Sequence, residues 1–186
     1  MILKITKFFL LTANQFIIMG AGVLPVALYK GALFLLLGQE RKNNLWADFG
    51  GSAHRGERPF KTAIREGTEE LNGFLGDENE FEALVTSNMI LSISYDKYTS
   101  YIFKTNYDKK LPYYFSNVNK FAELHLKDKI DIEHNGLFEK KQIQWISMSK
   151  LKEDKSQVIF REFYKPLFQS ILKNERFIIS FLQTME

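Results

Sequence analysis

The chain has 186 residues, a length typical of one domain with a well-filled core. Hydrophobic residues make up 45% of it and charged residues 25%, as is ordinary for a soluble globular protein. The absence of cysteine excludes disulfides, thiolate catalysis and cysteine metal sites, and the net charge of +3 permits an anionic substrate without requiring nucleic acid.

The N-terminal region is apolar but interrupted. Residues 8–29 contain no charged side chain, and Lys4 and Lys7 precede them. A basic start before an apolar run is typical of a signal peptide or a membrane span, but several polar residues and Pro25 break the run. We therefore expect β-sheet here, a cytoplasmic protein without membrane insertion, an N-terminal extension of uncertain structure over residues 1–20, and a single domain over residues 21–186.

The first regular elements are predicted to be strands. Residues 23–29 and 32–37 are two β runs, and Lys30 and Gly31 between them indicate a hairpin turn. A polar loop over residues 39–44 then leads to a short strand over residues 45–49.

A helix follows, with clear signals at both ends. Pro59 suits the first helical turn, and Asn72 and Gly73 accept the left-handed conformation just past the other end. One face is apolar, and the other carries three carboxylates at positions i, i+3 and i+4: Glu66, Glu69 and Glu70. Like charges at this spacing oppose a helix, and a hard divalent cation such as Mg²⁺ would remove the repulsion. The alternative for the acidic string alone is an ordinary solvated helix face.

The spacing of the surrounding residues distinguishes these readings. Six residues fall on the charged and glycine positions of the pattern GX5EX7REUXEEXGU, where U is a bulky aliphatic residue: Gly51, Glu57, Arg65, Glu66, Glu69 and Glu70. The stretch resembles the Nudix box, and its phrasing is somewhat similar to that of members from large DNA viruses and microbes. Gly67, Asn72 and Gly73 depart from the pattern, but no departure removes a charged position. We expect Gly67 to allow close approach of helix and sheet.

The rest of the chain contains further predicted strands and helices. Residues 83–104 are predicted to form a second hairpin with its turn at Asp96 and Lys97, and residues 116–127 a helix. Residues 142–148 alternate as a half-buried strand does, and Ser149 begins a helical turn. Aromatic and aliphatic residues then recur at helical spacing over residues 160–172, where Pro166 predicts a kink or two helices. This order favours an α+β sandwich, and the resemblance implies the Nudix fold, a mixed β-sheet between helices (α/β/α).

The resemblance also implies chemistry. Nudix enzymes hydrolyse a nucleoside diphosphate linked to another moiety by attack of water on phosphorus. The expected ligands of Mg²⁺, or of Mn²⁺, are Glu66, Glu69, Glu70 and the backbone carbonyl of Gly50, with Glu57 as a further candidate. Glu57 and Arg65 are expected to pin the loop to the helix, and Arg65 joins Glu69 and Glu70 among the catalytic candidates.

The catalytic base stays open between Glu139, Glu133 and a glutamate of the box. Glu139 lies six residues before Trp145, on the loop that supplies the base in many family members. The candidate substrate contacts are Gly51, His54 and Trp46. Tyr95 and Tyr98 can stack on a base, but tyrosines in a hairpin more often serve packing.

Three functions remain in view. The first is a pyrophosphohydrolase acting on a small nucleotide derivative. The second is an mRNA-decapping enzyme, with basic residues 104–110 and 120–129 guiding RNA, and the third is a non-catalytic nucleotide-binding module. A homodimer is a further possibility that the sequence does not decide.

Overall fold

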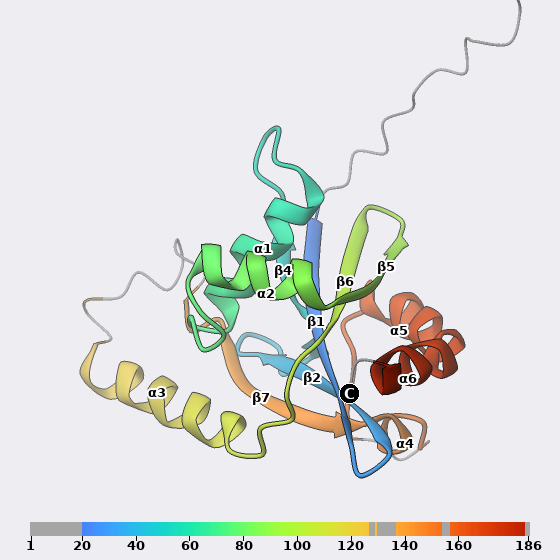
Figure 1. Cartoon of the computed structure of the whole chain (residues 1–186). Helices are drawn as coiled ribbons and strands as arrows, with labels where there is room; N and C mark the ends of the chain where they lie inside the picture. The colour runs from blue at the N-terminus through green and yellow to red at the C-terminus, as the bar shows by residue number, and fades with distance from the viewer. Residues whose placement is uncertain (1–19, 127–128, 130–136, 154–156, 185–186) are drawn as a thin grey trace, which may run out of the picture.

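The computed structural model describes residues 20–126, 129, 137–153 and 157–184 (Figure 1). Seven strands make one sheet: β1 (Gly20–Tyr29), β2 (Ala32–Glu40), β3 (Trp46–Ala47), β4 (Phe49–Ser52), β5 (Met89–Tyr95), β6 (Tyr98–Lys104) and β7 (Lys140–Ser147). Within the described ranges, no helix combines the length and apolar character needed to span a membrane. The predicted extension over residues 1–20 lies outside the described residues, except that Gly20 begins β1.

Strand β1 is the centre of the sheet. It pairs antiparallel with β2 and β4 and parallel with β6, so that the path runs β3-β2-β1-β6-β5, with β7 on the other side of β2. The predicted first hairpin is confirmed: Lys30 and Gly31 both have positive φ, as a tight two-residue turn requires.

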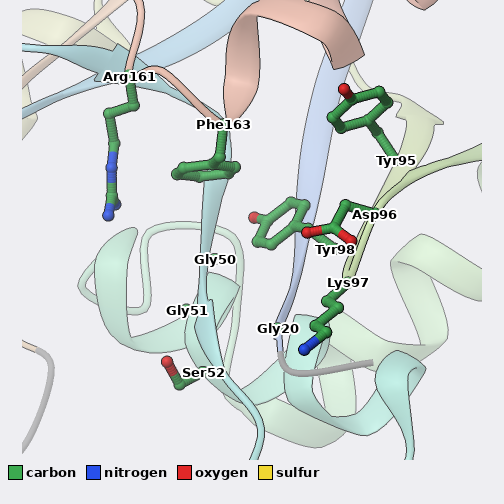
Figure 2. A pocket seen from close by; sticks show the side chains of 10 residues that line it. All are labelled: Gly20, Gly50, Gly51, Ser52, Tyr95, Asp96, Lys97, Tyr98, Arg161 and Phe163. Atoms are coloured by element: carbon green, nitrogen blue, oxygen red, sulfur yellow. The ribbon is translucent and has the colours of Figure 1, made fainter. Parts of the chain in front are cut away.

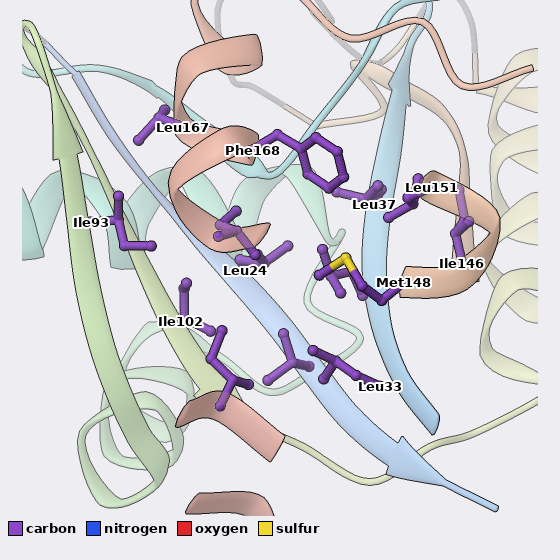
Figure 3. Close-up of a cluster of buried hydrophobic side chains, with 14 of the residues drawn as sticks. Leu24, Leu33, Leu37, Ile93, Ile102, Ile146, Met148, Leu151, Leu167 and Phe168 are labelled. Carbon is purple, nitrogen blue, oxygen red and sulfur yellow. The ribbon is translucent and has the colours of Figure 1, made fainter. Parts of the chain in front are cut away.

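Helices cover both faces of the sheet, which confirms the expected mixed sheet between helices. On one face lie α1 (Pro59–Glu70) and α2 (Glu78–Asn88), and α3 (Leu111–His125) packs along β7. On the other lie α4 (Met148–Leu151), α5 (Tyr164–Lys173) and α6 (Glu175–Thr184) (Figure 1). Each face has its own apolar cluster; Figure 3 shows the one under α5, which includes Leu24, Ile102 and Leu167.

The second predicted hairpin is wrong in its first half. Residues 78–88 form α2, and only residues 89–95 are a strand. The helix begins with a capping box, in which the Asp77 side chain accepts from the N–H of Glu80 and the Glu80 side chain accepts from the N–H of Asp77. The apolar character of the run that follows favours a strand, but Phe81 and Val85 lie one helical turn apart and are both buried, as in a helix packed on one face.

Three other boundaries also differ. The strand predicted over residues 45–49 is two short strands, β3 and β4, separated by the buried Asp48. Helix α3 begins at Leu111, where Pro112 fits the first turn. Pro166 makes no kink because it lies in the first turn of α5, and the chain leaves that helix at Asn174 instead.

Candidate active site

Helix α1 is held against the sheet by the absence of a side chain at Gly67. A Cβ atom there would lie 2.6 Å from Val23 Cγ2 and 2.8 Å from Phe81 Cε1. Close approach of helix and sheet is therefore the reason for glycine at this position, as expected from the sequence. Past the helix, Asn72 and Gly73 take φ values of 51° and 69°, which confirms the predicted stop signal.

Arg65 pins the preceding loop to the helix through Glu57. Its Nε lies 3.0 Å from Glu57 Oε1 and its Nη2 lies 3.1 Å from Glu57 Oε2, a bidentate pair. Glu57 Oε2 also accepts from the N–H of His54 and from the hydroxyl of Thr62. Both oxygens of Glu57 are therefore engaged by the protein, as the loop-pinning role requires.

These contacts make a pH-dependent contribution to stability. Hydrogen bonding from Arg65, joined by that from His54 and Thr62, lowers the pKa of Glu57 to about 2. A carboxyl group whose pKa is lower in the folded than in the unfolded protein makes its full contribution to folding stability above its unfolded pKa, about 4.5. That contribution is lost as the pH falls toward 2. We expect Glu57→Gln to cost about 1–3 kcal/mol at pH 7, with the gap to wild type closing between pH 4.5 and pH 2 in urea unfolding. A gap that is independent of pH would contradict this account.

The three box carboxylates occupy different environments. Glu66 lies beneath Gly51, where a Cβ atom would be 2.4 Å from Glu66 Oε2, and its Oε1 accepts from Arg65 at 2.9 Å. Glu69 is the most accessible, with 29% of its side chain exposed and Arg65 3.5 Å away. Glu70 is buried, and its Oε2 accepts from the N–H of Gly50 at 2.7 Å. The backbone of the glycine pair thus contacts two of the carboxylates: Gly50 donates its N–H to Glu70, and a side chain at Gly51 would displace Glu66.

A buried lysine that the sequence analysis missed stands beside Glu70. Lys140 Nζ lies 3.1 Å from Glu70 Oε1 and 2.5 Å from Glu40 Oε1, and Arg161 Nη1 lies 3.1 Å from the same Glu40 oxygen. Glu40 and Lys140 meet because β2 and β7 pair in a register that sets them opposite each other. No motif marks these residues, so only the strand pairing could have found them.

Glu139, the loop candidate, reaches the same cluster. One carboxylate oxygen from each of Glu139, Glu40 and Glu70 lies within 4.8 Å of the other two, a spacing that a metal ion could bridge. Burial raises the pKa of Glu66 and of Glu69 and Arg65 opposes the shift, while the charge of Glu139 makes a smaller raising contribution to both. Glu133, the other loop candidate, lies outside the described residues.

The residues present fit a divalent cation. Six carboxylates face three cationic side chains: Glu40, Glu57, Glu66, Glu69, Glu70 and Glu139 against Arg65, Lys140 and Arg161. Burial raises the pKa of Glu70 to about 8 although Lys140 opposes the shift, as expected for a cluster short of positive charge. Oxygen donors of this kind are those that Mg²⁺ and Mn²⁺ accept.

The predicted substrate contacts His54 and Trp46 differ in their exposure. His54 is exposed on the loop. It lies near enough to Glu69 to lower the pKa of that carboxylate, against the larger effect of burial. Trp46 is only 5% exposed and packs in the cluster under α5, so it offers no ring face to a substrate. The prediction that Trp46 contacts the substrate is therefore corrected, because β3 places its side chain in the core. Trp145 is half-buried, and its Nε1 donates to the carbonyl of Asp108.

The fold and the box together define the class: a Nudix-fold domain whose box carboxylates meet at the end of α1. Solved structures are similar to it at low sequence identity. One is a bifunctional NMN adenylyltransferase/ADP ribose pyrophosphatase from Francisella tularensis, with 17% identity and a TM-score of 0.52, covering 83% of this chain and 41% of that chain. Another is a C. elegans Ap4A hydrolase, with 16% identity and a TM-score of 0.49, covering 87% of this chain and 97% of that chain.

A third similar structure is the NUDIX domain of Shewanella oneidensis NrtR, with 11% identity and a TM-score of 0.45, covering 83% of this chain and 86% of that chain. Comparison with protein-family models finds no match, and neither does comparison with curated proteins. At 17% identity, the similarity to the F. tularensis structure, with its TM-score of 0.52, bears on the fold alone.

Proposed function

We propose that the protein is a Mg²⁺-dependent Nudix pyrophosphohydrolase that cleaves the pyrophosphate linkage of a nucleoside diphosphate derivative by attack of water on phosphorus. The observation that supports this most is the convergence of Glu139 with Glu70, because it adds the loop carboxylate to those of the box. The similar F. tularensis structure is complexed with AMP and a Mn ion, which agrees with the proposal.

The chain's own residues suit phosphoryl chemistry. Glu66, Glu69, Glu70 and Glu139 would hold the cation, with the carbonyl of Gly50 as an extra donor. The cation would neutralise pyrophosphate oxygens and lower the pKa of a bound water. Arg65 keeps Glu66 and Glu69 in position, and Lys140 does the same for Glu70. Glu139 would accept a proton from the attacking water, because its carboxylate lies within 4.8 Å of the carboxylate of Glu70.

A substrate panel tests the function. The full chain is incubated with Mg²⁺ and nucleotide sugars, dinucleoside polyphosphates, oxidised dNTPs, inositol pyrophosphates, free cap dinucleotide and a capped RNA of about thirty nucleotides. We expect cleavage of small nucleoside diphosphate derivatives with kcat/KM at least comparable to that for capped RNA, and loss of activity in EDTA. Release of m⁷GDP from the long RNA alone would favour decapping, and no turnover of any compound would favour a binding module.

The catalytic base has its own test. Glu139→Gln should lower kcat by about 10²–10⁴-fold, far more than Glu133→Gln, because a glutamine cannot accept the proton. Glu123→Gln on α3 is a matched control, since its side chain is 63% exposed and only its ion pair to Arg41 is lost. Steady-state kinetics on the best substrate measures the effect, and thermal unfolding checks the fold. A Glu139→Gln enzyme with wild-type kcat would remove Glu139 from the active site.

A further inference from the structure

Asn72 is a departure from the Nudix box that the proposed function does not use. It follows α1 with a φ of 51°, a left-handed conformation in which glycine, the usual residue of the pattern, meets no steric penalty. The backbone therefore favours glycine at this position, and what an asparagine adds is its side-chain amide.

The amide of Asn72 joins the end of α1 to two distant parts of the chain. Its Nδ2 donates to Oδ1 of Asn119 on α3 at 2.9 Å, and its Oδ1 accepts from the N–H of Phe138 at 2.9 Å. Phe138 immediately precedes Glu139 and has a φ of 62°. This conformation is unfavourable for a bulky residue and persists only where the surroundings hold it, so the bond from Asn72 fixes a strained point of the backbone.

Asn119 continues the connection on the other side of Glu139. It is 4% exposed on α3, which packs along β7, and its Nδ2 donates to the carbonyl of Lys140 at 2.7 Å. Because its Oδ1 accepts from Asn72, both ends of this buried amide are bonded. Asn72 and Asn119, here called the asparagine pair, thus bind the residues that directly precede and follow Glu139.

Arg41 fixes two further backbone groups at Glu139. Its Nε donates to the carbonyl of Phe138 at 3.2 Å, and its N–H donates to the carbonyl of Glu139 at 3.0 Å. The backbone on both sides of Glu139 is therefore held by hydrogen bonds, while one oxygen of its half-buried side chain lies within 4.8 Å of oxygens of Glu40 and Glu70. A fixed backbone limits the positions that this carboxylate can take, as precise placement requires.

The asparagine pair links the two elements whose side chains meet in the carboxylate cluster. Asn72 lies two residues past Glu70 at the end of α1, whereas Glu139 and Lys140 stand at the start of β7. Lys140 pairs with Glu70, and the Glu139 carboxylate lies close to it. The same short link therefore sets the spacing between the box carboxylates and the loop carboxylate.

We propose that the asparagine pair positions Glu139 against the box carboxylates, so that Glu139 contributes to the cation site and faces the attacking water. Both asparagines are positioning residues that act through Glu139. Groups that orient metal ligands from outside typically change metal affinity or activity by about 10- to 100-fold when they are removed. The role of Glu139 in turnover rests on the proposed function, whereas its contribution to cation binding is measured without turnover.

The asparagine pair is separate from the pocket that adjoins the glycine pair (Figure 2). That pocket, of about 390 Å³, is lined by the β5–β6 turn and by the segment before α5, which carries Arg161 and Phe163. The segment is fastened to β3, where the N–H of Arg161 donates to the carbonyl of Trp46. Neither Asn72 nor Asn119 lines the pocket, so changes at the asparagine pair leave its walls unaltered.

Replacing Asn72 by the glycine of the pattern tests the proposal, because glycine accepts the same backbone conformation and removes the side-chain bonds. Asn72→Gly should weaken Mn²⁺ binding about tenfold in a direct titration of the full chain and lower kcat about tenfold on the best panel substrate, with KM changed less than about twofold. Asn44→Gly is the matched control, since Asn44 is exposed with a φ of 59°, and it should keep wild-type values. Thermal unfolding checks the fold of each variant.

The Glu139→Gln background separates positioning from a general structural role. There Asn72→Gly should change Mn²⁺ affinity and kcat by less than about twofold, because the group that it positions is already lost. A loss of similar size in both backgrounds would overturn the proposal. So would wild-type Mn²⁺ affinity and kcat in Asn72→Gly, or the absence of Mn²⁺ binding by the wild type.

The outcomes also distinguish this proposal from the hydrolase proposal. If Mn²⁺ affinity depends on Asn72 only when Glu139 is present but no compound of the panel is cleaved, the positioning role stands and the hydrolase proposal fails. If cleavage occurs and Asn72→Gly leaves kcat and Mn²⁺ affinity unchanged, the hydrolase proposal stands and the positioning role fails.

Discussion

Glu70→Gln is expected to lower kcat by about two orders of magnitude or more, because charge stabilisation at the reacting phosphate is the largest catalytic contribution. Glutamine keeps the size of the side chain and can still accept from the N–H of Gly50, but it cannot balance a divalent cation. Glu69→Gln should have a similar effect on kcat, and it gives a second measurement at a carboxylate that lies away from Lys140. Steady-state turnover with Mg²⁺ on the best panel substrate measures both.

The fold should tolerate both changes: Glu69→Gln removes one of several like charges on α1, and in Glu70→Gln the buried Lys140 keeps its ion pair with Glu40. Glu123→Gln serves again as the exposed control and should keep wild-type turnover. Direct titration of Mn²⁺ into each variant reports cation affinity independently of catalysis. Wild-type kcat in Glu70→Gln, together with unchanged Mn²⁺ affinity, would show that Glu70 is not a metal ligand.

Lys140→Met should destabilise the protein by about 3–5 kcal/mol, the usual cost of removing one partner from a buried ion pair. The Lys140 ammonium is fully buried between Glu40 and Glu70, and these carboxylates raise its pKa although burial alone would lower it. Methionine fills a similar volume but leaves Glu70 without its cation and Glu40 with Arg161 alone. Urea unfolding at pH 7 measures the loss.

Lys141→Met is the matched control, because Lys141 is the next residue of β7 and its exposed ammonium donates to the side-chain oxygen of Asn44. It should change stability by less than about 0.5 kcal/mol. The double variant Lys140→Met/Glu40→Gln should regain part of the loss, since one unpaired carboxylate is gone. A loss below about 1 kcal/mol in Lys140→Met would mean that the buried pair is compensated elsewhere.

Patterns among residues close in sequence predict the Nudix box and the first hairpin correctly. The Gly51 to Glu70 spacing, the stop at Asn72 and Gly73, and the turn at Lys30 and Gly31 depend on residues close in sequence, where backbone preferences and helical periodicity act directly. The strand predicted for residues 83–88 is wrong because an apolar run fits a buried strand and a buried helix alike, and the capping box at Asp77 and Glu80 starts a helix.

The acidic helix and the loop that Arg65 pins to it could be predicted from spacing along one stretch of sequence, and the fold class from the order of the elements and the resemblance to the Nudix family. Three placements could not be predicted in this way: Lys140 and Glu40 beside Glu70, Arg161 and Phe163 in a pocket next to them, and Trp46 in the core. These placements depend on the register of β2 against β7 and on the docking of residues 159–161 at β3. Contacts between residues so far apart in sequence arise from strand pairing, which leaves no periodic signal in the chain.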